Sequence, residues 1–151
     1  MEVVSNSAKE TREAAADLAK KIIKSKPGKH AVVAALEGEL GAGKTTFAQG
    51  FARALGIKSR ITSPTFVLIK DYKLWTMGHR HLIHIDAYRL KGYKDLENLE
   101  VKEMIADPKN IILIEWSDRV KEVLPKNYIK IHIDHIDKNT RKIRLQIPST
   151  K

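Results

Sequence analysis

Short runs of apolar residues mark the strands of this chain. Residues 31–36 and 111–114 are apolar throughout, which is typical of strands buried on both faces. The β-rich runs 67–72 and 81–87 are joined by a segment containing Gly78, and this arrangement predicts a hairpin. These four runs predict the centre of a sheet.

Helical spacing appears between the strands. Ser7 and Glu10 form a capping box, and the apolar stripe that follows predicts an amphipathic helix over about 7–25. Its apolar face is best explained as a cover for the sheet, with a partner-binding face as the alternative. Residues 46–55 predict a helix closed by Gly56, and 93–106 predict one or two short helices.

The C-terminal part of the chain alternates between apolar and polar residues. This alternation over 128–134 and 140–147 predicts a hairpin spanning about 128–147 with one buried face. Strands and helices that follow one another in this way predict an α/β fold, and no boundary in the sequence suggests more than a single domain over 1–151.

A phosphate-binding loop lies between the first apolar strand and the following helix. Residues 38–45 match the pattern G-x-x-x-x-G-K-[ST] at every position. Glycines allow backbone N–H groups to turn toward phosphate oxygens, and the helix N-terminus favours the same anion. Lys44 is expected on the β- and γ-phosphates and Thr45 on magnesium. The residues expected to bind nucleotide here are Glu39, Leu40, Gly41, Ala42, Gly43, Lys44, Thr45 and Thr46.

Two acidic residues stand at the ends of later strands. Asp86 ends one apolar run and Glu115 ends another, where a magnesium ligand or a water-orienting base belongs if these strands flank the phosphate loop. The alternatives are a turn or cap residue for Asp86 and a strand-end cap for Glu115. Trp116 is a candidate to stack on a base, shield the site, contact a partner, or pack in the core.

A threonine, a pair of histidines and a second tryptophan are further candidates for a role at the site or on the surface. Thr65, after Ser63-Pro64, is a candidate switch residue that senses the γ-phosphate, with an ordinary strand-entry turn as the alternative. His81 and His84 are three apart, so on a strand they face opposite sides, and we interpret both as structural. Trp75 lies on a connection, where folding back onto the domain is favoured over a protein contact.

Composition narrows the class of protein. There are no cysteines, which excludes disulfides and fits a reducing compartment. No signal segment or membrane-length apolar run is visible, which predicts a cytoplasmic protein without membrane association. The 28 Lys and Arg against 18 Asp and Glu give a net charge of +10 and favour an anionic partner such as tRNA or an acidic protein, although solubility alone is an alternative explanation.

Together these motifs resemble the bacterial TsaE (YjeE) family. The resemblance lies in Gly38–Thr46, Ser63–Phe66, His84–Leu90 and Ile114–Trp116, in this order. Proteins of that family are ATPase components of the machinery that makes threonylcarbamoyladenosine (t6A) at position 37 of tRNA. The resemblance implies a three-layer P-loop NTPase-like domain with a mixed, partly parallel sheet, which binds ATP and Mg2+ and acts with TsaB and TsaD.

The resemblance also implies roles for single residues. Lys44 and Thr45 correspond to the phosphate and magnesium residues, Thr65 to the switch threonine, and Asp86 with Glu115 to the acidic pair, with Trp116 beside it. Two other functions remain as alternatives. They are a P-loop small-molecule kinase and an RNA-binding module whose nucleotide only stabilises the fold.

Overall fold

The computed structural model describes residues 1–39, 41–59, 61 and 68–148. Its strands form a sheet with seven strands in the order β1-β7-β6-β2-β5-β4-β3. The strands are β1 Glu2–Ser5, β2 Val32–Gly38, β3 Ile69–Lys73, β4 His81–Asp86, β5 Asn110–Glu115, β6 Ile129–His135 and β7 Arg141–Gln146. The helices are α1 Ala8–Lys24, α2 Lys44–Ala54, α3 Tyr93–Glu97 and α4 Val101–Ala106, with the 3-10 turns η1 Ser117–Arg119 and η2 Lys121–Val123.

The sheet is mixed, as predicted. Strand β2 is parallel to both β5 and β6, and β4 is parallel to β5. The β3–β4 and β6–β7 pairs are antiparallel, which confirms both predicted hairpins. Parallel strands need long crossover connections, and here α2 and the α3–α4 segment lie in those connections.

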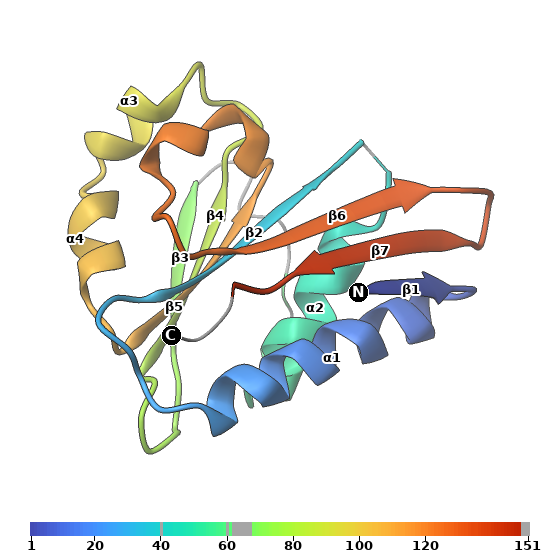
Figure 1. The fold of residues 1–151 in the computed structure, drawn as a ribbon, viewed down its shortest axis with the longest axis horizontal. Helices are drawn as coiled ribbons and strands as arrows, with labels where there is room; N and C mark the ends of the chain where they lie inside the picture. Colours follow the sequence, from blue (N-terminus) through green and yellow to red (C-terminus); the bar gives the residue numbers. More distant parts are fainter. Residues whose placement is uncertain (40, 60, 62–67, 149–151) are drawn as a thin grey trace.

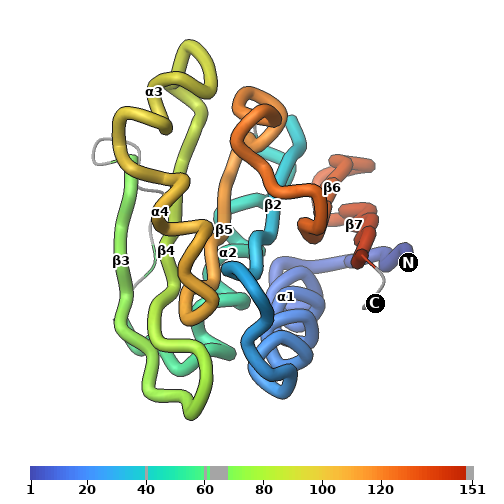
Figure 2. Tube along the Cα trace, turned by 60° about the vertical axis from the view of Figure 1, so that its left-hand side comes forward, coloured from blue at the N-terminus to red at the C-terminus, as the bar shows by residue number. Residues whose placement is uncertain are grey.

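Helices cover both faces of the sheet (Figures 1 and 2). One buried cluster joins α1 and α2 to residues such as Leu36, Leu113 and Ile131. The second joins α3, α4 and the 3-10 turns to residues such as Ile85 and Ile114. Since successive strand residues point to opposite faces, all six residues of β5 can be buried, and they are. The result is a three-layer α/β architecture.

Helix α1 begins as the capping box predicts. The Ser7 hydroxyl oxygen accepts a hydrogen bond from the Glu10 N–H at 3.1 Å, and the Glu10 carboxylate accepts one from the Asn6 N–H at 2.9 Å. The buried stripe of α1 faces the sheet and α2, which supports its interpretation as a cover for the core. Where α1 packs on α2, the backbone of Arg12 lies against Gly50, and a larger residue has no room there.

Three features differ from the sequence predictions. Helix α2 begins at Lys44 and not at Thr46, because the phosphate loop leads directly into its first turn. Strand β1 was not predicted; it is short and is held by antiparallel pairing with β7 at the far end of the chain. Trp75 was expected to fold back onto the domain, and this was wrong, since its side chain is 84% exposed.

Candidate functional site

The phosphate loop leaves the C-terminal end of β2 and enters α2. Gly38, Gly41 and Gly43 have φ angles of 154°, 79° and 105°, a range that side chains with a Cβ rarely adopt. A Cβ on Gly38 would also lie 2.6 Å from the Ile133 carbonyl oxygen of β6. The glycines are therefore required by the backbone path of the loop. Leu40, one of the predicted nucleotide-binding residues, lies outside the described residues.

Lys44 is buried in the loop that precedes it. Its ammonium donates hydrogen bonds to the carbonyl oxygens of Gly38 at 2.6 Å and Glu39 at 2.7 Å. It also lies 4.0 Å from the ring centroid of Trp116, a distance suited to a cation–π contact. Burial lowers the pKa of Lys44 below its ordinary value, while nearby carboxylates, with Glu115 first, oppose this shift. The lysine is thus fixed in position beside the loop.

The two predicted acids lie side by side. Asp86 and Glu115 are register partners at the C-terminal ends of the parallel strands β4 and β5. Both are buried, with 5% and 2% of their surface exposed. By alternation they share the sheet face of Leu82 and Leu113, which is the face that α2 covers. The fold therefore brings both carboxylates toward the phosphate loop.

Each acid has a partner that helps to hold it. One carboxylate oxygen of Asp86 accepts a hydrogen bond from the backbone N–H of Tyr88 at 3.0 Å. Glu115 is hydrogen-bonded to the imidazole Nε2 of His84, with Oε2 at 2.5 Å. His84 was interpreted as structural from the sequence, and the structure places it against this acid. A signal was present: His84 and Asp86 are two residues apart on a strand, so they share a face.

An aromatic group borders the acids. Trp116 has a positive φ of 60°, which turns its side chain out of the line of β5 at the point where the strand ends. Its ring centroid is 4.9 Å from that of Tyr88. The Arg119 guanidinium lies 5.3 Å from the Tyr88 ring and 5.7 Å from the Trp116 ring. Tyr88 and Trp116 line the pocket described below, and the Arg119 cation lies next to both rings.

These residues surround one open pocket of about 490 Å3. Eight of the predicted site residues line it, and two lining residues, Tyr88 and Arg141, were not among them. The lining residues are Gly41, Gly43, Lys44, Thr45, Thr46, Asp86, Tyr88, Glu115, Trp116 and Arg141. Glu39 and Ala42 are not among the lining residues, and the Ala42 N–H donates a hydrogen bond of 3.0 Å to the Glu39 carbonyl oxygen within the loop. Thr65 lies outside the described residues.

The donor set at this pocket suits magnesium better than a transition metal. Within the described ranges, no group of three or more His, Asp or Glu side chains is arranged to hold a metal ion by itself. The pocket offers the Thr45 hydroxyl and the Asp86 and Glu115 carboxylates, all of them oxygen donors. Magnesium is commonly held by one or two carboxylates together with substrate phosphates and water. The residues present therefore fit Mg2+ that arrives with a nucleotide.

The loop, the strand-end acids and the sheet order define this chain as a P-loop protein of the NTPase type. The family model described as "Threonylcarbamoyl adenosine biosynthesis protein TsaE" matches residues 5–143. The chain belongs to the TsaE family. In the described part of the chain, no helix is long and apolar enough to cross a membrane.

Curated relatives and a solved structure agree with this assignment. The chain is 40% identical to the tRNA threonylcarbamoyladenosine biosynthesis protein TsaE of Bacillus subtilis over 78% of this chain and 69% of that one. It is 42% identical to the protein of the same name from Nostoc, over 73% and 67% of the two chains. The crystal structure of Bacillus subtilis YdiB is similar over 99% of this chain and 86% of that one, with a TM-score of 0.73 and 32% identity.

Proposed function

We propose that this chain binds ATP with Mg2+ and hydrolyses it, as the ATPase component of t6A biosynthesis on tRNA. The observation that carries the proposal is the convergence of Lys44 and Thr45 with Asp86 and Glu115 at one pocket. Relatives at 40% and 34% identity, from Bacillus subtilis and Haemophilus influenzae, are named tRNA threonylcarbamoyladenosine biosynthesis proteins. The residues of the pocket support ATP binding and hydrolysis, and the names of the relatives support a role in t6A biosynthesis.

In the proposed mechanism the loop backbone and the N-terminus of α2 bind the β- and γ-phosphates. The Lys44 ammonium exchanges the carbonyl oxygens of Gly38 and Glu39 for phosphate oxygens, at little cost because it already lies beside the loop. The chemistry that bound Mg2+ would supply is neutralisation of the charge that develops on the phosphates. The Thr45 hydroxyl and one carboxylate would hold the ion.

Glu115 is the acid that we propose to orient the attacking water. Glu115 is buried at the end of β5 and hydrogen-bonded to His84 at 2.5 Å, which holds its carboxylate beside the pocket. Asp86, in register with it on β4, is then the ligand to magnesium. Thr65 keeps its proposed role as a switch residue on sequence grounds.

Trp116 provides a direct test of nucleotide binding. The chain has two tryptophans, and in Trp75→Phe all the tryptophan emission comes from Trp116, whose ring lies 4.0 Å from the Lys44 ammonium. Titration of this variant with ADP or ATP is expected to change its emission in a saturable way, more tightly with Mg2+ than without. Thr45→Ala should lose the Mg2+ dependence. A flat response in fluorescence, together with no heat in calorimetry, would contradict the proposal.

Turnover is measured as phosphate release, first for the chain alone and then with TsaB, TsaD and tRNA. We expect slow hydrolysis by the isolated chain and faster hydrolysis in the assembly, because P-loop NTPases commonly depend on a partner to complete the site. Transfer of the γ-phosphate to a metabolite in place of water would instead support the kinase alternative.

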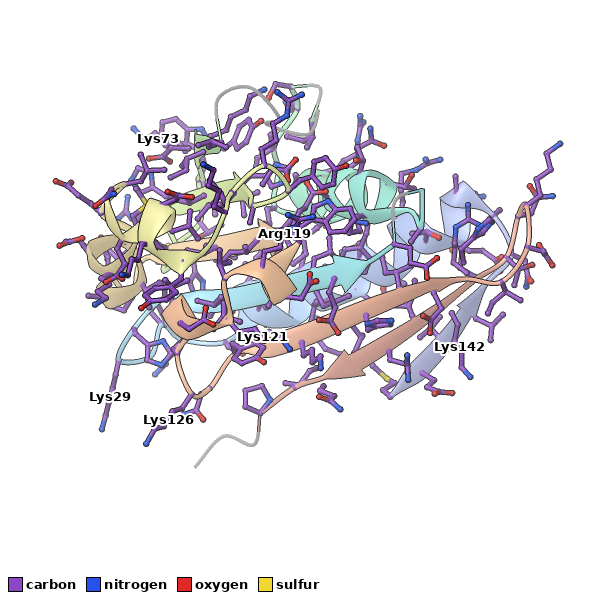
Figure 3. The ribbon with its side chains drawn as sticks, turned by 90° about the horizontal axis from the view of Figure 1, so that it is seen from above. Lys29, Lys73, Arg119, Lys121, Lys126 and Lys142 are labelled. Carbon is purple, nitrogen blue, oxygen red and sulfur yellow. The ribbon has the colours of Figure 1, made fainter. Side chains whose placement is uncertain are left out.

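The role of the positive charge needs a separate experiment. Figure 3 labels basic residues from separate elements and from connecting segments, and they are spread across the view: Lys29, Lys73, Arg119, Lys121, Lys126 and Lys142. tRNA binding by the chain alone, measured at several salt concentrations, tests direct contact. Binding that appears only with TsaB and TsaD assigns tRNA to the complex. Strong binding that ATP does not alter would support the RNA-module alternative.

A further inference from the structure

The two helices α1 and α2 carry a groove that the proposed reaction does not use. It has a volume of about 890 Å3, against about 490 Å3 for the phosphate-loop pocket, and the two share no lining residue. One wall comes from α1, and the other comes from α2 and the segment that follows it as far as Ile61. Both helices lie against the same face of the sheet (Figure 1). The α1–α2 groove is therefore a surface separate from the candidate active site.

Positive charge is concentrated along both walls of this groove. Five of the side chains that line it are cationic, and one, Glu13, is acidic. The cations are Lys9, Arg12 and Lys20 on α1, Arg53 on α2 and Lys58 four residues beyond the end of α2, and all of them are exposed. In the described ranges none of the five forms an ion pair, whereas Lys102, Lys130 and Arg144 elsewhere in the chain do. The groove therefore presents a field that attracts an anion.

Helix stability does not explain the cations of α1. Lys9 lies in the first turn of α1, at the positive end of the helix dipole, where a cation is unfavourable. Arg12 follows three positions later on the same face of the helix, so the two like charges repel each other. Solubility would be served equally well by charges spread over the surface. An anion bound between the walls would reduce both of these costs.

The inner lining of the groove is small and apolar. Apart from Gln49, the lining residues that are half-buried or buried are Ala16, Gly50, Ala54, Ile57 and Ile61. Gly50 packs against the backbone of Arg12, so the two helices approach closely there. The Gln49 side-chain amide donates a hydrogen bond to the Ile61 carbonyl oxygen at 3.3 Å, which ties the segment after α2 to the groove wall. A ligand therefore meets cations at the rim and apolar atoms between them.

This combination favours an acidic protein segment over RNA. Single-stranded RNA is commonly bound by stacking of its bases on aromatic side chains, and no described lining residue is aromatic. The phosphates of a duplex contact Lys and Arg and gain nothing from an apolar lining. A protein segment with carboxylates and small apolar side chains uses both features of the groove.

The length of the charged wall sets the size of that segment. Lys9 and Lys20 mark its ends on α1, and eleven residues of helix correspond to about 16 Å. An extended segment of about five residues spans this distance.

We infer that the α1–α2 groove binds an acidic segment of a partner protein, with carboxylates on the five cations and small apolar side chains against the inner lining. This inference deepens the proposed function, because it names the surface through which the chain joins the t6A assembly.

The test compares two charge reversals that alter the net charge equally. Arg12→Glu combined with Arg53→Glu changes one cation on each wall of the groove. Lys121→Glu combined with Lys126→Glu changes two exposed cations outside the groove and is the matched control (Figure 3). The probe is the TsaB–TsaD complex, whose binding to each protein is measured by interferometry with ATP and Mg2+ at several salt concentrations.

The groove reversal should weaken binding of TsaB–TsaD by about tenfold or more, mainly through slower association, because the cations steer an anionic partner. The control reversal should stay within about twofold of the original chain. Rising salt should weaken binding by the original chain more steeply than binding by the groove variant, because salt screens the charges that the variant has lost.

Folding and nucleotide binding are followed in the same variants. Both reversals change exposed side chains outside the phosphate-loop pocket, so thermal unfolding and ADP affinity should stay close to those of the original chain. Arg12→Gln combined with Arg53→Gln removes the two charges without adding new ones, and we expect a smaller loss of about threefold. This milder pair decides the question if the reversal prevents folding.

Three results would overturn the inference. They are equal binding of TsaB–TsaD by the folded groove variants and the original chain, no binding of TsaB–TsaD by the original chain, and a loss of tRNA affinity in the groove variants with TsaB–TsaD binding unchanged. The last result would assign the groove to RNA. The proposed ATPase function fails separately, if the original chain binds neither ADP nor ATP.

Discussion

His84 Nε2 lies 2.5 Å from Oε2 of Glu115, and both side chains are almost completely buried. An ionised carboxylate can only accept hydrogen bonds, so the imidazole N–H is the donor. The two residues stand on neighbouring parallel strands and join the middle of β4 to the end of β5. This bond limits the positions that the Glu115 carboxylate can take beside the pocket.

Removal of His84 should therefore affect both stability and turnover. His84→Ala leaves a buried carboxylate without its donor, and we expect a loss of about 1–3 kcal/mol in the free energy of unfolding. We expect kcat to fall while ADP affinity is kept, and His84→Gln, which retains an N–H donor, to recover part of kcat. Urea unfolding and phosphate release measure the two effects.

His81 is the matched control for this experiment. It lies on the opposite face of the same strand, and its ring is 42% exposed and hydrogen-bonded to Asp71. His81→Ala should change the free energy of unfolding by less than about 1 kcal/mol and leave kcat unaltered. Equal effects of the two substitutions would contradict a positioning role for His84.

Glu115→Gln tests the proposed water-orienting acid. The amide has nearly the same shape but cannot accept a proton, so we expect nucleotide affinity to be kept and kcat to fall by about a hundredfold or more. Calorimetry with ADP and phosphate release measure the two quantities. Glu122→Gln makes the same change at an exposed position in η2 and should have no effect. Turnover that survives in Glu115→Gln would mean that another group orients the water.

Gly50 tests the packing of α1 on α2. A Cβ at this position would lie 2.5 Å from the Arg12 Cα and closer still to its carbonyl oxygen, both backbone atoms that cannot turn away. Gly50→Ala should therefore lower the free energy of unfolding by about 1–3 kcal/mol or more, despite the better helix propensity of alanine. Gly28→Ala, with nothing within 4 Å, is the control. If Gly50→Ala is as stable as the original chain, α1 and α2 can move apart to admit a Cβ at little cost in the free energy of unfolding.

His79 links stability to pH. It is 1% exposed, and within the described residues neither ring nitrogen has a hydrogen-bond partner. Burial lowers the pKa of His79 below its usual 6.5, so the unfolded chain binds the proton more readily than the folded chain. Stability is then lost as the pH falls below about 6.5, by at most about 1.4 kcal/mol per pH unit from this group.

Unfolding in urea between pH 8 and pH 5 measures this dependence. His79→Leu removes the titrating group and should flatten the fall in stability at acid pH relative to the original chain. An identical slope in the two proteins would show that other groups among the six histidines and the carboxylates cause the dependence.

Local patterns were sufficient for much of the fold. The apolar run of β5 and the capping box of α1 act over a few residues, so their elements could be predicted from short windows of sequence. Strand β1 was missed because its pairing with β7 joins residues such as Val3 and Ile143, which are far apart in the chain. Helix α2 was placed two residues late because the turn geometry of Gly43 cannot be read from its identity alone.

The site residues also divide into those that a local sequence pattern reveals and those that depend on contacts between distant parts of the chain. The glycines, Lys44 and the strand-end acids stand in a recognisable pattern, and the parallel pairing of β4 with β5 brings Asp86 and Glu115 together. Arg141 gave no such signal, because it lies beside Gly43 only through the sheet order and the geometry of a hairpin turn. The sequence shows only an arginine in a strand of alternating polar and apolar residues, and this pattern does not indicate which residue the side chain contacts.

The central place of β2 has a consequence for local motion. Its backbone is hydrogen-bonded to parallel strands on both sides, whereas β1 and β3 are the edge strands of the sheet formed by the described residues. Amide hydrogens of β2 should therefore exchange with solvent only on global unfolding, while those at the edges exchange through local opening. The phosphate loop, which must rearrange around phosphates, follows directly after β2, the strand expected to exchange most slowly. Rearrangement of the loop therefore need not spread into the sheet.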